Sequence, residues 1–197
     1  MATGRPREFD TEQALDRAME LFWQKGYEGT SLSDLTETMG ITRPSLYAAF
    51  GNKEALFRTV LKRYETKVVT YRPKALNAPT AGELARELLI GAANIFGDRR
   101  NPAGCLGVQS ALVCGDEADP IRRTLNANRT AGEHAIRERL KRAKAEGDLP
   151  ADSNPAALAR YLSAVLYGMA VLAAAGSSRK DLLQVAEMAL QSWPASR

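Results

Sequence analysis

Residues 42–50 carry a set of side chains whose chemistry suits contact with double-stranded DNA. Arg43 is the only residue of this segment that could make a bidentate hydrogen bond to a guanine. Ala48 and Ala49 are small enough to allow a close approach to the bases and could touch a thymine methyl group. Tyr47 offers a hydroxyl that suits a phosphate contact. The segment therefore combines base-contacting and phosphate-contacting groups within one short stretch.

Two short helices joined by a tight turn would present these side chains on one surface. Ser31 is a good N-cap for a helix over residues 32–39, and Gly40 supplies the left-handed residue that ends this helix. Thr42 caps the next helix, and Pro44 falls in its first turn, where a missing N–H costs nothing. These are the dimensions of a helix-turn-helix, whose second helix lies in the major groove of DNA.

Two flanking helices should complete a small helical head around this pair. Asp10 caps a first helix that ends at Gly26, and Asn52 caps a fourth helix, whose start also suits a phosphate. Leu46 and Phe50 stand four residues apart, so both must point into the core of the head. The spacing alone also occurs in helical proteins that never meet DNA, so by itself it leaves DNA binding and plain packing both open. The candidate DNA contacts are Ser33, Thr42, Arg43, Pro44, Ser45, Tyr47, Ala48 and Lys53.

Several spaced segments between Phe9 and Tyr64 form a more specific pattern. They are Gly26-Tyr27-Glu28-Gly29-Thr30-Ser31, Leu35, Met39-Gly40-Ile41, Ser45-Leu46-Tyr47-Ala48-Ala49-Phe50 and Asn52-Lys53-Glu54-Ala55-Leu56. Together they resemble the DNA-binding head of the TetR/AcrR family of transcriptional regulators. The Leu-Tyr-x-x-Phe-x-x-Lys core of that family is present as Leu46, Tyr47, Phe50 and Lys53.

This resemblance implies an all-α homodimer with a ligand-receiving body and a repression that a small ligand relieves. It also implies that Tyr47 and Lys53 anchor phosphates, and that Arg43, Ser45 and Ala48 lie near bases. The matched stretch covers a little over a quarter of the chain. The helices that follow match the family only in length, number and order.

The N-terminal Gly4-Arg5-Pro6-Arg7 suggests an additional DNA contact. Arginines beside a proline in an extended arm, here Arg5 and Arg7, can enter a narrow minor groove, where the potential is most negative. The alternative is an unstructured tail. We expect a DNA-binding domain with this arm over residues 1–52, and a ligand-binding and dimerisation domain over residues 53–197.

Helical periodicity continues through the rest of the chain, and strand signals are almost absent. We expect a linker over residues 72–80, because Pro73 and Pro79 fall there. Further helices are expected to follow over residues 84–96, 106–113, 118–146, 155–175 and 178–193. The predicted architecture is all-α, with about nine helices.

The composition is that of an ordinary globular protein and gives no sign of an enzyme. The 197 residues carry a net charge of +4, but the first 74 hold 12 Lys and Arg against 10 Asp and Glu. DNA binding must therefore depend on where charges lie rather than on their number. No nucleophile elbow, phosphate loop, dinucleotide fingerprint or zinc spacing occurs, and the one histidine, His134, stands in a charged segment. We expect no catalysis, no cofactor and no metal.

The chain shows no signal peptide, and its longest charge-free stretch, residues 161–178, has too short an apolar part to span a membrane. A cytoplasmic protein is expected.

An architectural DNA-binding protein without an effector is a competing class. The large apolar part after residue 80 argues against it, because DNA architecture alone does not require such a body.

The last two predicted helices are apolar on more than one face. One face can fill the core of the subunit, and the other should be covered by a second copy in an isologous four-helix interface. Such a homodimer would hold two heads about 34–36 Å apart, one turn of the duplex, so the operator should be palindromic. The residues that form these faces are Leu158, Leu162, Val165, Leu166, Met169, Leu172, Leu182, Leu183, Val185, Ala186, Ala189, Leu190 and Trp193.

An apolar pocket should lie in the body and accept a small, mostly apolar effector. Few charges fall among the candidate lining residues, so a neutral or aromatic ligand is favoured over a nucleotide or a sugar phosphate. Each of these residues could instead be plain core. The candidates are Leu84, Leu88, Ile95, Phe96, Cys105, Leu112, Tyr161 and Tyr167.

Two further features each have a structural and a functional interpretation. Cys105 should sit at a helix start with two arginines just upstream, which would activate a thiol for oxidant or electrophile sensing. Small buried cysteines are more often packing residues, and we favour packing. A bridge from Cys105 to Cys114 would be too long within one continuous helix. The basic run over residues 137–144 is interleaved with glutamates, so a solvated face is favoured over a second nucleic-acid patch.

Overall fold

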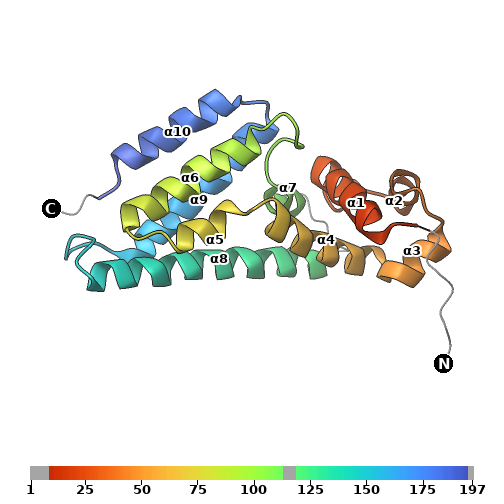
Figure 1. Ribbon diagram of the computed structural model, residues 1–197, viewed down its shortest axis with the longest axis horizontal. Helices are drawn as coiled ribbons and strands as arrows, with labels where there is room; N and C mark the ends of the chain where they lie inside the picture. The colour runs from red at the N-terminus through yellow and green to blue at the C-terminus, as the bar shows by residue number, and fades with distance from the viewer. Residues whose placement is uncertain (1–8, 113–118, 195–197) are drawn as a thin grey trace.

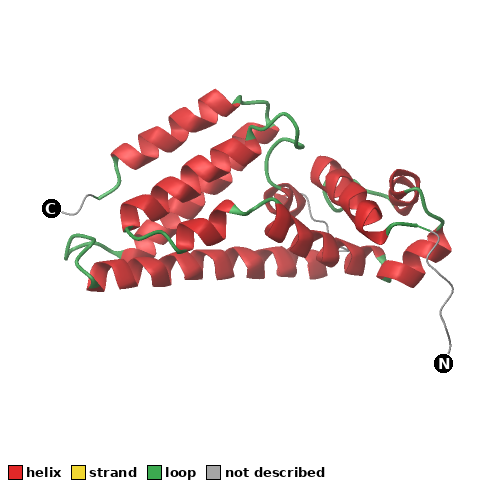
Figure 2. Ribbon diagram, in the orientation of Figure 1, coloured by secondary structure: helices red, strands yellow, loops and turns green. Residues whose placement is uncertain are grey.

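The computed structural model describes residues 9–112 and 119–194, and within these ranges it contains ten α-helices and no strand (Figures 1 and 2). The all-α prediction is confirmed. The helices are α1 Thr11–Lys25, α2 Leu32–Met39, α3 Arg43–Phe50, α4 Lys53–Lys67, α5 Tyr71–Leu76, α6 Ala81–Phe96, α7 Leu106–Leu112, α8 Asp119–Ala145, α9 Pro155–Ala174 and α10 Arg179–Gln191.

The first three helices form a head at one end of an elongated molecule (Figure 1). Each helix begins at the cap that the sequence predicts: the Asp10 side chain accepts the N–H of Glu12 at 2.9 Å, and the Ser31 and Asp34 side chains form a capping box. Gly40 adopts φ 69° and ψ 35°, the left-handed conformation that lets α2 stop and α3 start at an angle to it.

The remaining helices form a layered body. The long helix α8 runs along one edge of the molecule and reaches beneath α4, which connects the head to the body (Figure 1). Helices α6, α9 and α10 pack against one another, and α9 also packs on α8. The helix α7 contacts α1 and α4 on one side and α8 and α9 on the other, so it lies where head and body meet.

The predicted linker over residues 72–80 is wrong in its first half, because α5 occupies residues 71–76. Tyr71 and Ala75 are one helical turn apart and both are buried against α6, which stabilises the turn. Pro73 does not break this helix, because it lies in the first turn, where the N–H has no helical partner. Gly91 of α6 allows the close packing: a Cβ there would lie 2.4 Å from the Tyr71 Cβ.

The basic run on α8 is also not uniformly solvated. Lys141 and Arg142 are exposed, but Arg139 is only 6% exposed. Its Nη2 donates to the carbonyl oxygens of Ala78 and Pro79 at 2.7 and 2.9 Å. Arg139 is therefore a structural residue that ties α8 to the segment after α5.

Candidate DNA-binding surface and effector pocket

The helix pair α2 and α3 presents one exposed polar surface and one buried apolar surface. Leu46 is fully buried, while Thr42, Arg43 and Pro44 are exposed and Tyr47 is 48% exposed. Ala48 and Ser33 are also exposed, and Ser45 and Ala49 are half-buried. The candidate contacts predicted from the sequence therefore lie on the solvent side of the head. Arg5 and Arg7 of the predicted arm lie outside the described residues.

Two hydrogen bonds, one within α3 and one between α2 and α3, hold the start of α3 in place. The Thr42 side chain caps α3 by accepting the Ser45 N–H at 3.3 Å. The Arg43 Nη2 donates to the Ser33 Oγ on α2 at 2.9 Å, across the turn. Arg43 keeps its other guanidinium N–H groups for a base or a phosphate, because a guanidinium has five donors. Ser33 thus positions the one residue here that can make a bidentate contact to guanine.

Lys53 stands at the first residue of α4 and is half-buried. Its Nζ lies 4.4 Å from the centre of the Tyr27 ring, a cation–π contact. Burial lowers the pKa of Lys53, and the nearby carboxylates of Glu28 and Asp34 oppose that shift. The Tyr27 ring therefore fixes the position of a cation at a helix N-terminus, which is a suitable arrangement for binding a phosphate.

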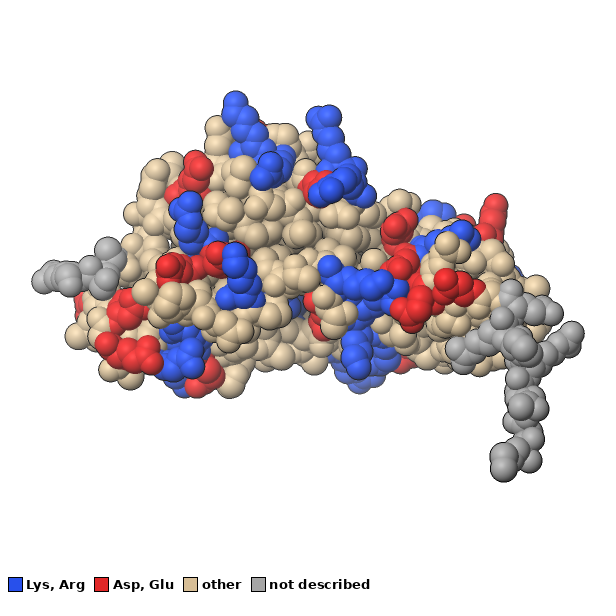
Figure 3. Space-filling model, in the orientation of Figure 1, with Lys and Arg blue, Asp and Glu red and all other residues tan. Residues whose placement is uncertain are grey.

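The charge of the head is mixed, as the sequence predicts. Figure 3 shows Asp and Glu side chains over α1 interspersed with Lys and Arg. Part of this charge is used within the head: the Arg63 Nη1 lies 2.6 Å from the Glu12 Oε2, and Arg63 also pairs with Asp16. These ion pairs tie α1 to α4, so the orientation of the head depends on α4.

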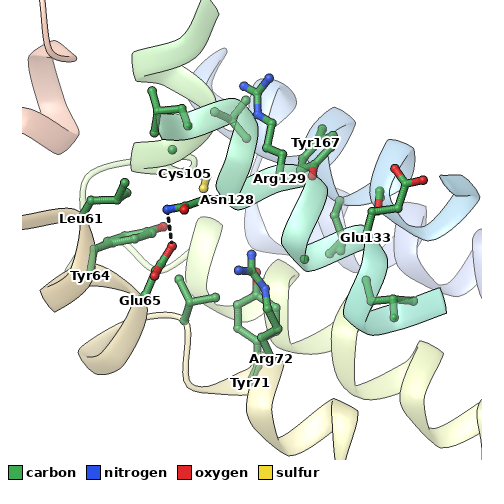
Figure 4. Close-up of a pocket in the computed structure, with 18 of the residues that line it drawn as sticks. Leu61, Tyr64, Glu65, Tyr71, Arg72, Cys105, Asn128, Arg129, Glu133 and Tyr167 are labelled. Atoms are coloured by element: carbon green, nitrogen blue, oxygen red, sulfur yellow. Dashed lines mark hydrogen bonds between the residues drawn. The ribbon is translucent and has the colours of Figure 1, made fainter. Parts of the chain in front are cut away.

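A cavity of about 70 Å³ lies in the body, between α4, α5, α7, α8 and α9 (Figure 4). Its wall combines apolar side chains with tyrosines and four charged groups. The lining residues are Leu61, Tyr64, Glu65, Val69, Tyr71, Arg72, Phe96, Cys105, Gly107, Val108, Leu125, Asn128, Arg129, Gly132, Glu133, Ile136, Ser163, Leu166 and Tyr167.

The structure brings only some of the predicted lining residues to this cavity. Phe96, Cys105 and Tyr167 line it. Leu84 and Leu88 do not, because both are fully buried in the core that α6 forms with its neighbours.

Three other candidates also do not contribute to the described wall. Ile95 packs half-buried against the core. Tyr161 is 39% exposed and its hydroxyl lies 3.1 Å from the Ser192 Oγ of α10, on the outside of the body. The side chain of Leu112, like Cys114, lies outside the described residues.

The expectation of few charges in the pocket is wrong, since Glu65, Arg72, Arg129 and Glu133 all line it. Sequence reasoning missed them because Arg72 fell in the supposed linker and α8 has the composition of a solvated helix. Gly132 stands among charged residues of α8 and is a weak sequence signal for a cavity, because a glycine leaves open space beside the helix. Which face of α8 is covered is a property of the packing and not of the local sequence.

Buried tyrosines form the wall of the cavity nearest the head. Burial raises the pKa of the Tyr64 hydroxyl well above its usual value, and the adjacent Cys105 thiol adds to this. Burial also raises the pKa of Tyr71, where Arg72 opposes the shift. Both phenols are therefore neutral hydrogen-bonding groups at any pH at which the protein would function.

A direct contact links this wall to the head. The Trp23 Nε1 of α1 donates to the carbonyl oxygen of Gly104 at 3.2 Å, in the buried interior. The Trp23 ring packs edge-on against Tyr64, with ring centres 4.8 Å apart. Gly104 precedes Cys105, which lines the cavity. A change in the cavity can thus reach α1 through very few side chains.

The outer surface of α9 and α10 is apolar and exposed. Val171, Leu172 and Met188 are 45%, 42% and 66% exposed. Met188 lines a shallow groove between the two helices, together with Tyr161 and Val165. Within the described part of the chain nothing covers this surface. Leu162, Leu166, Met169, Leu182, Ala186 and Ala189 of the predicted set face the subunit's own core instead.

The described ranges also bear on metal binding and on membrane insertion. No group of three or more His, Cys, Asp or Glu side chains there could hold a metal ion. The helix α9 has the length and hydropathy of a membrane span, but 39% of its apolar window is buried inside the helical body. A core helix of a soluble protein has the same properties.

Comparisons with known proteins agree with this geometry. Residues 14–60 match the family model for bacterial regulatory proteins of the tetR family, and residues 83–189 match the model for the tetracyclin repressor-like C-terminal domain. The chain is 36% identical over 193 residues to the HTH-type transcriptional repressor ComR of Escherichia coli, covering 97% of this chain and 92% of ComR. It is 32% identical to the transcriptional repressor BdcR of the same organism, covering 94% and 90%.

A solved structure is similar over nearly the whole chain. It is a cysteine mutant of the TetR family transcriptional regulator CifR, complexed with 26bp double-strand operator DNA. The two chains are 46% identical and superpose with a TM-score of 0.92, covering 96% of this chain and 100% of the CifR chain. The helix-turn-helix head, the helical body and these matches together show that the chain belongs to the TetR family of DNA-binding transcriptional regulators.

Proposed function

We propose that this protein is a repressor that binds a palindromic operator as a homodimer and leaves it when a small effector enters the cavity of the body. The observation that carries the proposal is the surface of α2 and α3, where Leu46 is buried and Arg43 is held outward by Ser33. The named repressors among its relatives support the direction of regulation. The protein acts on DNA in the cytoplasm and has no catalytic role.

We infer the following division of labour. Residues 1–52 contact DNA, with Arg43, Ser45 and Ala48 near bases and Tyr47 and Lys53 on phosphates. Arg5 and Arg7 contact the minor groove. Residues 53–197 bind the effector and form the dimer.

The effector site is the cavity beside α4. It is small, about 70 Å³, and lies behind the helix whose N-terminus carries Lys53. A ligand that pushes α4 and α8 apart would tilt the head through α4 and through the Trp23 contact. Release follows only if the ligand prefers the conformer whose heads no longer fit the operator, because a ligand with equal affinity for both conformers shifts nothing.

Cys105 is proposed to be a packing residue of the cavity wall. The test compares operator affinity of the wild type and Cys105→Ser before and after mild peroxide or a quinone. We expect neither treatment to change the affinity of either protein. Loss of operator binding in the wild type alone would instead make the thiol a sensor.

The test of the proposed function is a fluorescence-anisotropy titration with the DNA upstream of the protein's own coding sequence. The wild type should bind a palindromic site tightly and random DNA of equal length far more weakly. A variant Glu187→Lys, altered on the exposed far end of the chain, should bind in the same way. Equal affinity for the palindrome and the random duplex would refute sequence-specific regulation.

A further inference from the structure

The four charged side chains around the cavity differ in whether they have a hydrogen-bond or ion-pair partner. The Glu65 Oε1 accepts a hydrogen bond from the Asn128 Nδ2 at 3.0 Å, and the Glu133 Oε1 lies 3.7 Å from the Arg160 Nε. Arg72 and Arg129, in contrast, have no carboxylate within 4 Å in the described parts of the chain. The wall therefore carries two carboxylates and two guanidiniums, and neither guanidinium forms an ion pair within the described residues (Figure 4).

One polar group of the wall, the Nε of Arg129, is buried and has no hydrogen-bond partner among the described residues. This nitrogen can only donate a hydrogen bond. Buried polar groups are almost always paired, so it calls for an acceptor. The Arg129 guanidinium is held in place by the Tyr167 ring, with 5.5 Å from its Cζ to the ring centre. A ligand with an acceptor oxygen would satisfy this nitrogen.

The volume of the cavity and its apolar lining residues limit which kind of ligand could bind there. A cavity of about 70 Å³ holds on the order of five waters, since each needs roughly 10–15 Å³ of such space. Leu61, Leu125 and Ile136 supply apolar surface. A nucleotide does not fit, and an inorganic anion would leave this apolar surface unused.

We propose that the effector is a compact organic acid, bound as its carboxylate in the field of Arg72 and Arg129, with its apolar part against Leu61, Leu125 and Ile136. The inference rests on the proposed function, because it names the chemical class of ligand for the same site. An arginine is the preferred partner of a carboxylate, since its planar fork can donate two parallel hydrogen bonds.

The experiment compares acids with their neutral isosteres. Binding of benzoate, benzamide, butyrate, butyramide and inorganic phosphate to the full-length protein is measured by calorimetry and by thermal shift, at an ionic strength kept constant with chloride. Release of the operator duplex is then measured by anisotropy under the same conditions. At least one of the two acids should bind about tenfold more tightly than its amide and should release the operator, and phosphate should do neither.

Two variants and a control locate the site. Arg129→Gln and Arg72→Gln should each weaken binding of the acid by about tenfold, because each removes a positive charge from the cavity. Arg123→Gln is the matched control, since it changes an exposed arginine of the same helix α8 that pairs with Asp119 and does not line the cavity. Operator binding without ligand is measured for all three variants, and unchanged affinity there shows that the head still folds.

Three results would overturn the inference. They are amides that bind as tightly as the acids, acids that bind Arg129→Gln and Arg72→Gln as tightly as the wild type, and no binding of either acid. Failure of the proposed function is a separate result, since it requires that the wild type does not select its operator. A neutral amide that releases the operator would leave the proposed function intact and refute only the organic-acid inference.

Discussion

Neighbouring side chains hold Arg43 and Lys53 in position. DNA could bind both residues without breaking these contacts completely. Arg43 uses one nitrogen for Ser33, and Lys53 lies over Tyr27 with its ammonium still partly open to solvent. Pre-positioned side chains lose less conformational freedom on binding, which favours affinity. The two residues should nevertheless contribute in different ways, because base contacts specify and phosphate contacts position.

Arg43→Ala should relax sequence preference at one operator position, at a cost of about 1–3 kcal/mol for the preferred base. Affinities for an operator series with single-base changes, measured by anisotropy, check this. Ser33→Ala should cause a smaller loss of the same preference, because it frees the Arg43 side chain without removing it. Unchanged preference in Arg43→Ala would place the base contact elsewhere.

Lys53→Ala should weaken binding to all sequences alike, because it removes a phosphate contact. The slope of the logarithm of the binding constant against the logarithm of salt concentration should fall by about one unit. A titration at several salt concentrations measures it. Lys62→Ala changes a lysine of the same helix and serves as the comparison. Full operator affinity in Lys53→Ala at physiological salt would contradict the proposed docking.

Asp16 is a residue whose ionisation should be visible in stability. Hydrogen bonds from Arg63, and further from Lys67, lower the pKa of Asp16, against a smaller opposing effect of burial. A carboxyl whose pKa is lower in the folded state stabilises the protein above its unfolded pKa, about 3.9, and loses that contribution as the pH falls through the lower folded value. Asp16→Asn should therefore reduce the free energy of unfolding at pH 7, and this reduction should shrink as the pH falls below about 3.9.

The expected loss at pH 7 is about 1 kcal/mol or less, because the Asp16 side chain is 39% exposed and its ion pairs are partly solvated. Urea denaturation at several pH values measures it. Glu20→Gln changes an exposed carboxylate of the same helix and should have no such pH dependence. A loss in Asp16→Asn that stayed constant as the pH fell below about 3.9 would show that packing, and not charge, stabilises the α1–α4 contact.

At the scale of elements, the close packing of α5 on α6 depends on Gly91. Gly91→Ala would put a Cβ 2.4 Å from the Tyr71 Cβ, so α5 must shift. Overpacking of this kind costs about 1–3 kcal/mol, which should exceed the gain in helix propensity. Because Tyr71 lines the cavity, the same substitution should also change the effector site.

Gly132→Ala provides the matched comparison in α8. Nothing lies within 4 Å of a Cβ at that position, so this variant should gain about 0.5–1 kcal/mol from helix propensity. Equilibrium denaturation at one fixed protomer concentration measures both variants, because the stability of a dimer depends on concentration. Effects of the same sign in the two variants would contradict the α5–α6 packing described above.

At the scale of the whole molecule, the exposed apolar surface of α9 and α10 is the proposed dimer interface. Met188→Glu should convert the protein to a monomer at micromolar concentration without unfolding it, because Met188 is 66% exposed within one subunit. Operator affinity should fall by about 100-fold or more, because two heads no longer bind as one unit. Sedimentation velocity and anisotropy test these two expectations.

Glu187→Lys is the control for Met188→Glu, because it changes the charge of an exposed neighbour that does not line the groove between α9 and α10. It should remain dimeric. A wild-type protein that sediments as a monomer would disprove the assembly, whatever the variants do.

Local sequence determined where the helices begin and end. Asp10, Ser31, Thr42 and Asn52 cap the helices that they were expected to cap, because a side-chain oxygen needs only the N–H groups of the next turn. The head followed from the same kind of short-range rule, together with the resemblance of residues 9–64 to a known family. Among the helices, α5 is the exception: the sequence predicted a linker there, and the helix depends on the burial of Tyr71 by α6, twenty residues further on.

The cavity was decided by the tertiary structure. It joins Tyr64 of α4, Arg72 of α5, Cys105 at the start of α7, Arg129 of α8 and Tyr167 of α9. No short window of sequence relates these positions. A charged residue on a long polar helix faces solvent or a cavity according to which neighbours cover it, and that depends on contacts between residues far apart in the chain. The sequence therefore predicts candidate DNA-contacting side chains, and only the fold shows that arginines line the pocket.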